Sequence, residues 1–212
     1  MLSLRSGSGW LAIVLAGVAW GAAVLGSQEA SAQTVVRVEE DWELVVSNPD
    51  TTVTAPQVTC TISPTADTEG LYAAFELNHR SQPSFSPGGI QIQVWNGDAL
   101  LTARDWNTSN QLSTANETVR WTQTMTVTGT NLVFEVVNGS STTWGAFGGE
   151  GYLKATVSAP LTNLNAYHPD VSVENSGVSY AGNRVASLVL REVRLVLSSG
   201  VVLRDTTPRT VH

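Results

Sequence analysis

The 212-residue sequence contains a single cysteine, Cys60, and few charged side chains. One cysteine excludes an intramolecular disulfide framework and a zinc site built on several thiolates. Cys60 lies between Val58 and Ile62 in an alternating segment, which predicts a small, buried apolar side chain, with pairing to a second chain as the alternative. Charged residues make up 14% of the chain, below the roughly 25% of typical soluble proteins, but the hydrophobic share of 42% does not indicate disorder.

Basic residues are fewer than acidic ones in this chain. There are 11 Lys and Arg against 18 Asp and Glu, which gives a formal net charge of −7. Binding to nucleic acid depends on grouped Lys and Arg side chains that neutralise phosphates. The sequence has no such group, so we expect no nucleic-acid partner.

The N-terminal segment has the pattern of an export signal. Arg5 is the only charged residue before an uncharged run from Gly9 to Leu25, and Ala30-Ser31-Ala32 follows just before Gln33. This order predicts a secretory signal peptide over residues 1–32. The apolar run of 17 residues is at the lower limit for crossing a bilayer, so a retained anchor is the alternative. We expect a secreted, extracytoplasmic protein of residues 33–212 without a stable membrane span.

Alternation of apolar and polar residues, the pattern of half-buried strands, dominates residues 33–212. It is clearest in residues 119–128, where four threonines alternate with apolar residues and are expected to face solvent. Further segments with strand character are Val35–Val38, Trp42–Val46, Gln57–Ser63, Leu71–Leu77, Ile90–Trp95, Ala99–Ala103, Leu132–Val137, Tyr152–Val157, Leu188–Leu197 and Val201–Arg204. Asn96-Gly97 and Ser198-Ser199-Gly200 predict turns, and no stretch shows helical periodicity. This pattern predicts an all-β fold, an antiparallel two-sheet β-sandwich of jelly-roll type, in a single domain.

Opposite charges gather at the two ends of this domain. Its start is acidic, with Glu39, Glu40, Asp41 and Glu43, and the segment after Asn183 is basic, with Arg184, Arg191, Arg194, Arg204 and Arg209. Cross-strand pairs of opposite charge stabilise a sheet by up to about 1 kcal/mol each. We infer that the first and last strands lie near one another; head-to-tail association between chains is the alternative.

Two segments resemble concanavalin A-like (laminin G-type) jelly-roll domains. Residues 186–195, ASLVLREVRL, look like the closing strand of those domains, and residues 88–95, GGIQIQVW, look like a middle strand. The chain also resembles uncharacterised secreted bacterial proteins. The resemblance covers about twenty residues and implies a two-sheet jelly roll, often with glycan binding on a concave face.

The run from Glu39 to Glu43 matches an E-x-D-x-E pattern that resembles the catalytic strand of retaining glucanases. On a strand, Glu39, Asp41 and Glu43 share one face, and retaining hydrolysis needs two carboxyl groups about 5 Å apart. The match departs from the family at Glu40, where an apolar residue is expected, and in its position so early in the chain. Carboxylates four residues apart on a strand also start about 13 Å apart at the backbone. An acidic, solvated edge is the alternative.

A second catalytic hypothesis rests on Glu76, His79 and Arg80, with Tyr72 on the same alternating face. In a lyase-like cluster an arginine neutralises a uronate while Tyr or His moves the proton. A His beside an Arg at an exposed strand end is the alternative. The sequence has no pair of histidines at metal spacing, no G-x-S-x-G and no phosphate-binding glycine loop.

The candidate ligand-binding residues are amides and aromatics. Gln91, Gln93 and Trp95 alternate with apolar residues, and a glycine-rich segment adds Trp144 and Tyr152. A pyranose has an apolar face and hydroxyl edges, so an aromatic plate beside hydrogen-bonding side chains suits a sugar. The alternative is that Trp95 packs under a loop and Trp144 fills the end of the sandwich.

No cofactor is expected from the sequence. Asp67, Glu69, Asp98 and Asp105 lie in predicted turns and are of the type that binds Ca²⁺, but their spacing defines no calcium loop. The leading hypothesis is therefore a secreted, non-catalytic module that binds a glycan or another cell-surface polymer. The alternatives are a self-associating cell-surface subunit and a polysaccharide lyase or glycoside hydrolase.

Overall fold

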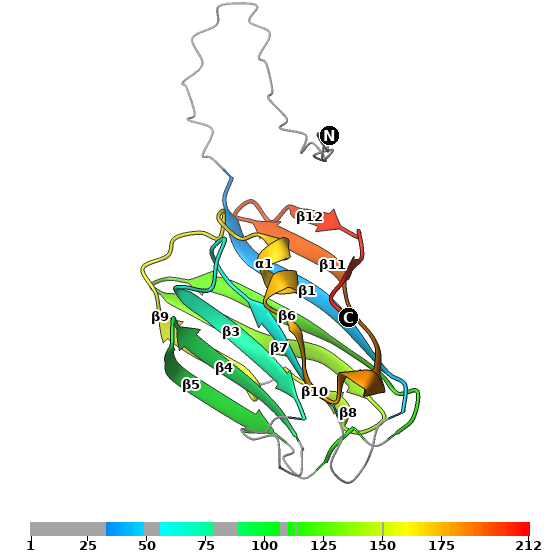
Figure 1. Cartoon of the computed structure of the whole chain (residues 1–212). Coiled ribbons are helices and arrows are strands. Elements are labelled where there is room, and N and C mark those ends of the chain that lie inside the picture. The colour runs from blue at the N-terminus through cyan, green and yellow to red at the C-terminus, as the bar shows by residue number, and fades with distance from the viewer. Residues whose placement is uncertain (1–32, 49–55, 79–88, 107–109, 113, 150) are drawn as a thin grey trace, which may run out of the picture. The chain divides into compact units, whose positions relative to one another are not determined.

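A computed structural model describes residues 33–48, 56–78, 89–106, 110–112, 114–149 and 151–212, and the expected signal peptide lies outside these residues. The described residues form two antiparallel sheets, one of eight strands and one of five, that pack together (Figure 1). The predicted all-β, two-sheet sandwich is confirmed. Within the described part of the chain, no helix is long and apolar enough to cross a membrane.

The eight-stranded sheet, called sheet A here, contains both ends of the domain. Its central path runs in the order β12 (Val202–Asp205), β11 (Val185–Leu197), β1 (Val35–Val46), β6 (Thr118–Thr128), β7 (Asn131–Ser141) and β8 (Gly145–Phe147). In addition, β13 (Arg209–Thr210) pairs with β11, and β9 (Lys154–Ser158) pairs with β7.

The five-stranded sheet, sheet B, has the order β10 (Gly177–Tyr180), β2 (Gln57–Ile62), β3 (Leu71–Leu77), β4 (Ile90–Asn96) and β5 (Ala99–Trp106). The β4–β5 turn lies one residue later than predicted, at Gly97-Asp98. Gly97 has a φ of +54°, and a side chain there would approach the Glu69 carbonyl oxygen, so this position favours glycine.

One short helix was not predicted from the sequence. Helix α1 (Pro169–Glu174) has six residues, too few to show an amphipathic period, and a 3₁₀ turn follows at η1 (Gly182–Arg184). The local signals were Pro169 in the first turn and Asp170 beside it, which suits a helix N-terminus. Val171 and Ser172 on this helix are buried.

The core lies between the sheets and is rich in aromatic side chains. Trp42 of β1 and Trp121 of β6 face each other across the strands and stack with ring centroids 6.4 Å apart. Phe75 of sheet B packs against Trp121 of sheet A with ring centroids 5.4 Å apart, and this contact joins the two layers. Cys60 is fully buried in this core, as predicted from its alternation.

The acidic segment near the start of the domain belongs to one continuous strand. The sequence predicted separate strands on either side of Glu39, Glu40 and Asp41, but all three lie within β1. The expected contact between the ends of the domain is confirmed, because β1 pairs with β11 and Glu39 lies opposite Arg194. The Arg194 guanidinium donates hydrogen bonds to both Glu39 and Asp41, and the Arg194 side chain is only 14% exposed.

The threonines of β6 are less exposed than predicted. Thr122 and Thr124 lie on the outer face of sheet A but are only 4% and 2% exposed. Thr122 donates a hydrogen bond to Asp41 at 2.7 Å and accepts one from Asn138 at 3.4 Å. Neighbouring polar side chains therefore cover a position that period-two alternation assigns to solvent.

Glu40 points into the core and has no exposed surface. One carboxylate oxygen accepts hydrogen bonds from the hydroxyls of Tyr167 at 2.7 Å and Ser172 at 2.5 Å, and the other accepts one from Trp42 Nε1 at 3.0 Å. Burial raises the pKa of Glu40 from 4.5 to about 7, although the bonds from Ser172, Tyr167 and Trp42 act in the opposite direction. Glu40 thus joins β1 to helix α1 and the segment before it.

Glu40 makes stability depend on pH in a defined direction. The folded protein keeps the Glu40 proton up to about pH 7, whereas the unfolded chain loses it near pH 4.5. The contribution of protonated Glu40 to the free energy of unfolding is therefore complete below pH 4.5 and is lost as the pH rises to 7. Glutamine at position 40 does not titrate, so the free energy of unfolding of Glu40→Gln, measured relative to that of wild type, should rise by about 3 kcal/mol from pH 4 to pH 8. Urea denaturation at several pH values measures this, with Glu174→Gln as the exposed control. Parallel wild-type and Glu40→Gln curves would contradict it.

Arg194 should contribute more to stability than the exposed Arg204. Loss of Arg194 leaves Asp41 without its guanidinium, while Glu39 keeps its pair with Arg37. Arg194→Ala should therefore lower the free energy of unfolding by about 2 kcal/mol at pH 7. Arg204 is 60% exposed and pairs with Glu192, so Arg204→Ala should cost less than about 1 kcal/mol. Chemical denaturation measures the free energy of unfolding of both variants. Equal losses in Arg194→Ala and Arg204→Ala would contradict this prediction.

Candidate functional site

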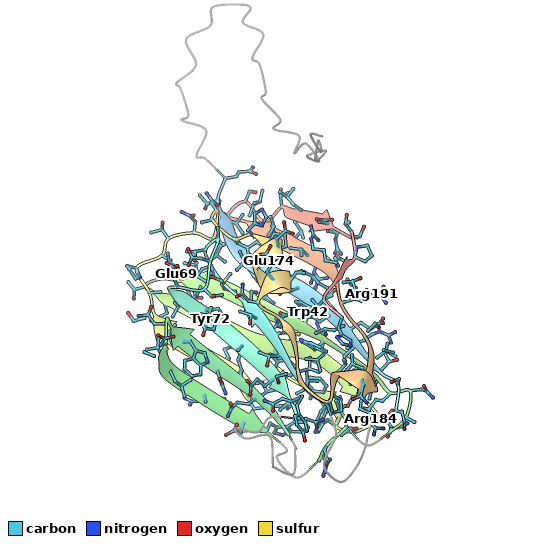
Figure 2. All side chains as sticks on the ribbon, viewed as in Figure 1. Trp42, Glu69, Tyr72, Glu174, Arg184 and Arg191 are labelled. Atoms are coloured by element: carbon cyan, nitrogen blue, oxygen red, sulfur yellow. The ribbon has the colours of Figure 1, made fainter. Side chains whose placement is uncertain are left out.

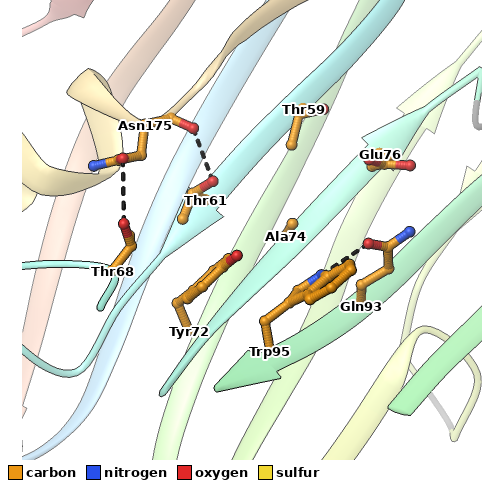
Figure 3. A pocket seen from close by; sticks show the side chains of 9 residues that line it. All are labelled: Thr59, Thr61, Thr68, Tyr72, Ala74, Glu76, Gln93, Trp95 and Asn175. Carbon is orange, nitrogen blue, oxygen red and sulfur yellow. Dashed lines mark hydrogen bonds between the residues drawn. The ribbon is translucent and has the colours of Figure 1, made fainter. Parts of the chain in front are cut away.

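A hollow of about 300 Å³ lies on the outer face of sheet B (Figure 3). Side chains from β2, β3 and β4 line it, together with residues from two connections. They are Thr59, Thr61, Thr68, Tyr72, Ala74, Glu76, Gln93, Trp95 and Asn175. This set combines two aromatic rings with hydroxyl, amide and carboxylate groups.

Strand alternation explains both the position and the shape of this hollow. Tyr72, Ala74 and Glu76 occupy alternate positions of β3 and face outward, while Phe75 between them lies in the core. Ala74 is paired with Gln93 on β4, and the larger residues on either side of it rise above its methyl group. The hollow therefore has its floor at Ala74 (Figure 3).

The aromatic pair comes from neighbouring strands. Tyr72 on β3 lies opposite Trp95 on β4, and both side chains are partly exposed. Figure 3 shows the two rings side by side at one end of the hollow. Partial burial raises the pKa of the Tyr72 hydroxyl, and the nearby charge of Asp98 raises it further. The tyrosine is therefore a neutral hydroxyl at physiological pH.

A row of hydrogen bonds holds the polar side chains of β4. Trp95 Nε1 donates to Gln93 Oε1 at 2.8 Å, Gln93 donates to Gln91, and Gln91 donates to Asp105 on β5. We call these four residues the amide row. Gln91 was predicted as a ligand contact; it is 6% exposed and does not line the hollow, and within the row it supports Gln93.

The opposite wall of the hollow comes from distant parts of the chain. Asn175 directly follows helix α1, and its backbone carbonyl accepts a hydrogen bond from Thr61 at 2.9 Å. Its side-chain oxygen accepts one from Thr68 at 3.4 Å. Sequence reasoning missed Asn175 and Thr68, because neither lies in a strand with the alternation that identified Trp95.

Two predicted ligand-binding residues lie elsewhere. Trp144 is 5% exposed, packs on Phe147 and donates to the Asn110 carbonyl at 3.3 Å, and this burial agrees with the alternative of a packed position. Tyr152 packs against Trp106, whose strand partner Ile90 is a core residue. Tyr152 therefore lies on the core side of sheet B, away from Trp95.

The described residues of the two catalytic hypotheses lie on different sheets. Glu76 lines the hollow at the end away from Tyr72, with Ala74 between them, whereas His79 and Arg80 lie outside the described residues. On sheet A, Asp41 and Glu43 line a separate depression of about 500 Å³. Tyr72 and Arg191 mark the two different sheets in Figure 2.

Asp41 and Glu43 on sheet A are held as ions. Burial opposes ionisation of Asp41, but hydrogen bonds from Arg194 and Thr122 outweigh it and lower its pKa. A hydrogen bond from Arg191, aided by Arg120, lowers the pKa of Glu43 in the same direction. Retaining hydrolysis needs one carboxyl group with a raised pKa to act as the acid. Neither Asp41 nor Glu43 meets that requirement.

Within the described ranges, no three His, Cys, Asp or Glu side chains come together in a way that would hold a metal ion.

Comparisons with known proteins add no family assignment. No protein-family model matches the chain, and no curated protein matches it. The geometry of the sandwich and its hollow therefore carries the functional argument.

Proposed function

We propose that the protein is a secreted, non-catalytic module that binds a glycan in the hollow on sheet B. The observation that carries this proposal is the placement of Trp95 and Tyr72 with Gln93 and three threonines around the floor at Ala74. Aromatic faces cover the C–H face of a pyranose, and amides and hydroxyls match its hydroxyl edge.

The size of the hollow limits the ligand unit. About 300 Å³ is at the small end of ligand sites, so a monosaccharide or disaccharide unit fits better than a longer enclosed chain. The hollow opens on the face of a sheet, so a polymer can pass over it with one or two units in contact. This suits attachment to a cell-surface or extracellular polysaccharide.

Substitution of Trp95 tests the proposal directly. We expect saturable binding of a small soluble saccharide, with cellobiose and N,N′-diacetylchitobiose as the first probes, read by tryptophan fluorescence and calorimetry. Trp95→Ala should raise the Kd at least tenfold, equivalent to about 1.4 kcal/mol, because the aromatic plate is lost. Leu203→Ala, an exposed apolar residue on sheet A, is the control. Binding that is unchanged in Trp95→Ala would refute the site, and shortened products would favour the enzyme alternative.

Ala74→Leu tests the hollow without removing a polar contact. Ala74 is 6% exposed and forms the floor, so a leucine there occupies the space that the sugar would take. We expect Ala74→Leu to weaken binding at least tenfold while the unfolding midpoint stays close to that of wild type. Ala103→Leu, on the same face but outside the hollow, should leave binding intact. Full affinity in Ala74→Leu would place the ligand elsewhere.

A second candidate function is self-association through sheet edges. Among the described residues, the exposed large apolar side chains are Leu100, Leu101, Val201, Val202 and Leu203. Leu100 and Leu101 belong to β5, the last strand of sheet B, and the other three lie in or beside β12, the last strand of sheet A. Unpaired edges with apolar side chains are sites where a further strand can add.

Association through these edges predicts a mass that depends on concentration. Sedimentation velocity between about 1 and 100 μM should show larger species at high concentration in the wild type. Leu101→Lys combined with Leu203→Lys should shift the protein towards the monomer, because charged edges oppose strand addition. Thr130→Lys, in the exposed β6–β7 turn, is the control for added charge. A monomer across the whole range would refute this candidate.

A further inference from the structure

The amide row has a fixed chemical direction. Its first member, Asp105, accepts a hydrogen bond from Gln91 at a carboxylate oxygen, and its last member, Trp95, has an indole N–H that only donates. Between them, Gln91 and Gln93 each donate from nitrogen towards Asp105 and accept at oxygen from the Trp95 side. Each amide has two orientations, but only this one satisfies both ends of the row.

Asp105 lies outside the hollow and is connected to it through Gln91 and Gln93. Asp105 lies on the edge strand β5, opposite Gln91, and does not line the hollow itself. Gln91 is almost fully buried within the row, so its amide has little freedom to bond with water instead. The orientation imposed at Asp105 is therefore passed through Gln91 to Gln93, which does line the hollow.

We propose that Asp105 is a positioning residue of the ligand-binding face, setting through Gln91 the amide orientation of Gln93 and the hydrogen bond that holds the Trp95 indole. This inference rests on the proposed function. Asp105 touches no ligand. It determines which atoms of Gln93 and Trp95 a ligand meets.

The fixed direction also determines the ligand chemistry that the face accepts. The Trp95 N–H is used within the row, so the indole offers a ligand its ring face. Gln93 keeps one amide N–H and one oxygen lone pair after its two bonds in the row. A donor and an acceptor side by side match two adjacent sugar hydroxyls or an acetamido group. The face is therefore suited to neutral sugars and N-acetylated amino sugars.

Reversing the polarity of the row tests the proposal. Asp105→Lys places an obligate donor at the end of the row, so Gln91 and Gln93 turn their oxygens towards position 105 and the Trp95 N–H loses its acceptor. Asp105→Asn keeps an acceptor oxygen and preserves the row. In the ¹⁵N-labelled protein without ligand, the Trp95 indole N–H, assigned with Trp95→Phe, should exchange at least tenfold faster in Asp105→Lys and within about twofold of wild type in Asp105→Asn.

Two controls separate this effect from charge and from general loosening. Asp98→Lys makes the same charge change in the exposed β4–β5 turn, outside the row, and should leave the indole exchange unchanged. Gln91→Leu breaks the row in its middle, so Asp105→Lys in that background should add no further effect at Trp95. Unchanged indole exchange in Asp105→Lys, or an equal effect with and without Gln91, would overturn the assignment.

Binding provides the second measurement. The affinity for N,N′-diacetylchitobiose and cellobiose should fall at least fivefold in Asp105→Lys and stay within twofold of wild type in Asp105→Asn. The exchange experiment needs no ligand, so the two proposals fail separately. If the wild type binds neither disaccharide, the proposed function loses its support while indole exchange still decides the role of Asp105. If both disaccharides bind equally well to wild type and Asp105→Lys, the positioning role is refuted.

Discussion

Strand β1 lies between β11 and β6, and most of the sandwich depends on how its two faces are used. Outward, Glu39, Asp41 and Glu43 meet arginines from the neighbouring strands. Inward, Val38, Trp42 and Leu44 enter the core with Glu40 among them. A shift of one residue would bury the paired carboxylates and expose the tryptophan, so the register of β1 is strongly specified. That register brings the two ends of the domain together.

Glu40 is the exception to the apolar inner face of β1. A buried carboxyl group is unfavourable unless its hydrogen-bonding capacity is satisfied, and Glu40 meets that condition through Trp42, Tyr167 and Ser172. The last two belong to the segment that contains helix α1. The residue after that helix, Asn175, forms a wall of the hollow on sheet B. The first strand of the domain therefore helps to position one side of the candidate site, although it contributes no residue to it.

The candidate site uses a different strategy from the charged face of sheet A. On sheet A, carboxylates and guanidinium groups neutralise each other and leave paired ions. On sheet B, uncharged amides and hydroxyls surround a small floor residue between two aromatic rings. The amide row is anchored by one carboxylate on the edge strand, and its orientation is fixed before a ligand arrives. Such preorganisation lowers the entropic cost of binding.

The all-β class, most strand positions, the burial of Cys60 and the outward face of Gln93 and Trp95 could all be predicted from the sequence alone. These features follow from period-two alternation, a local property that each segment carries independently of its neighbours. The sequence also predicted the contact between the domain ends, because opposite charges favour cross-strand pairing. The short helix α1 and the burial of Glu40 and Thr122 gave no such periodic signal.

Which of the predicted surface residues lie together in one hollow depends on the packing of the whole fold. Trp144 and Tyr152 are aromatic residues of a glycine-rich segment that was predicted to be exposed, yet they pack on the core side, because burial depends on which strands and loops lie against them. Thr68 and Asn175 join the hollow from positions 107 residues apart in the chain. Their contact depends on the order of strands in sheet B and on the placement of α1 beside it. Pairing between distant segments is a property of the whole fold, which no local pattern records.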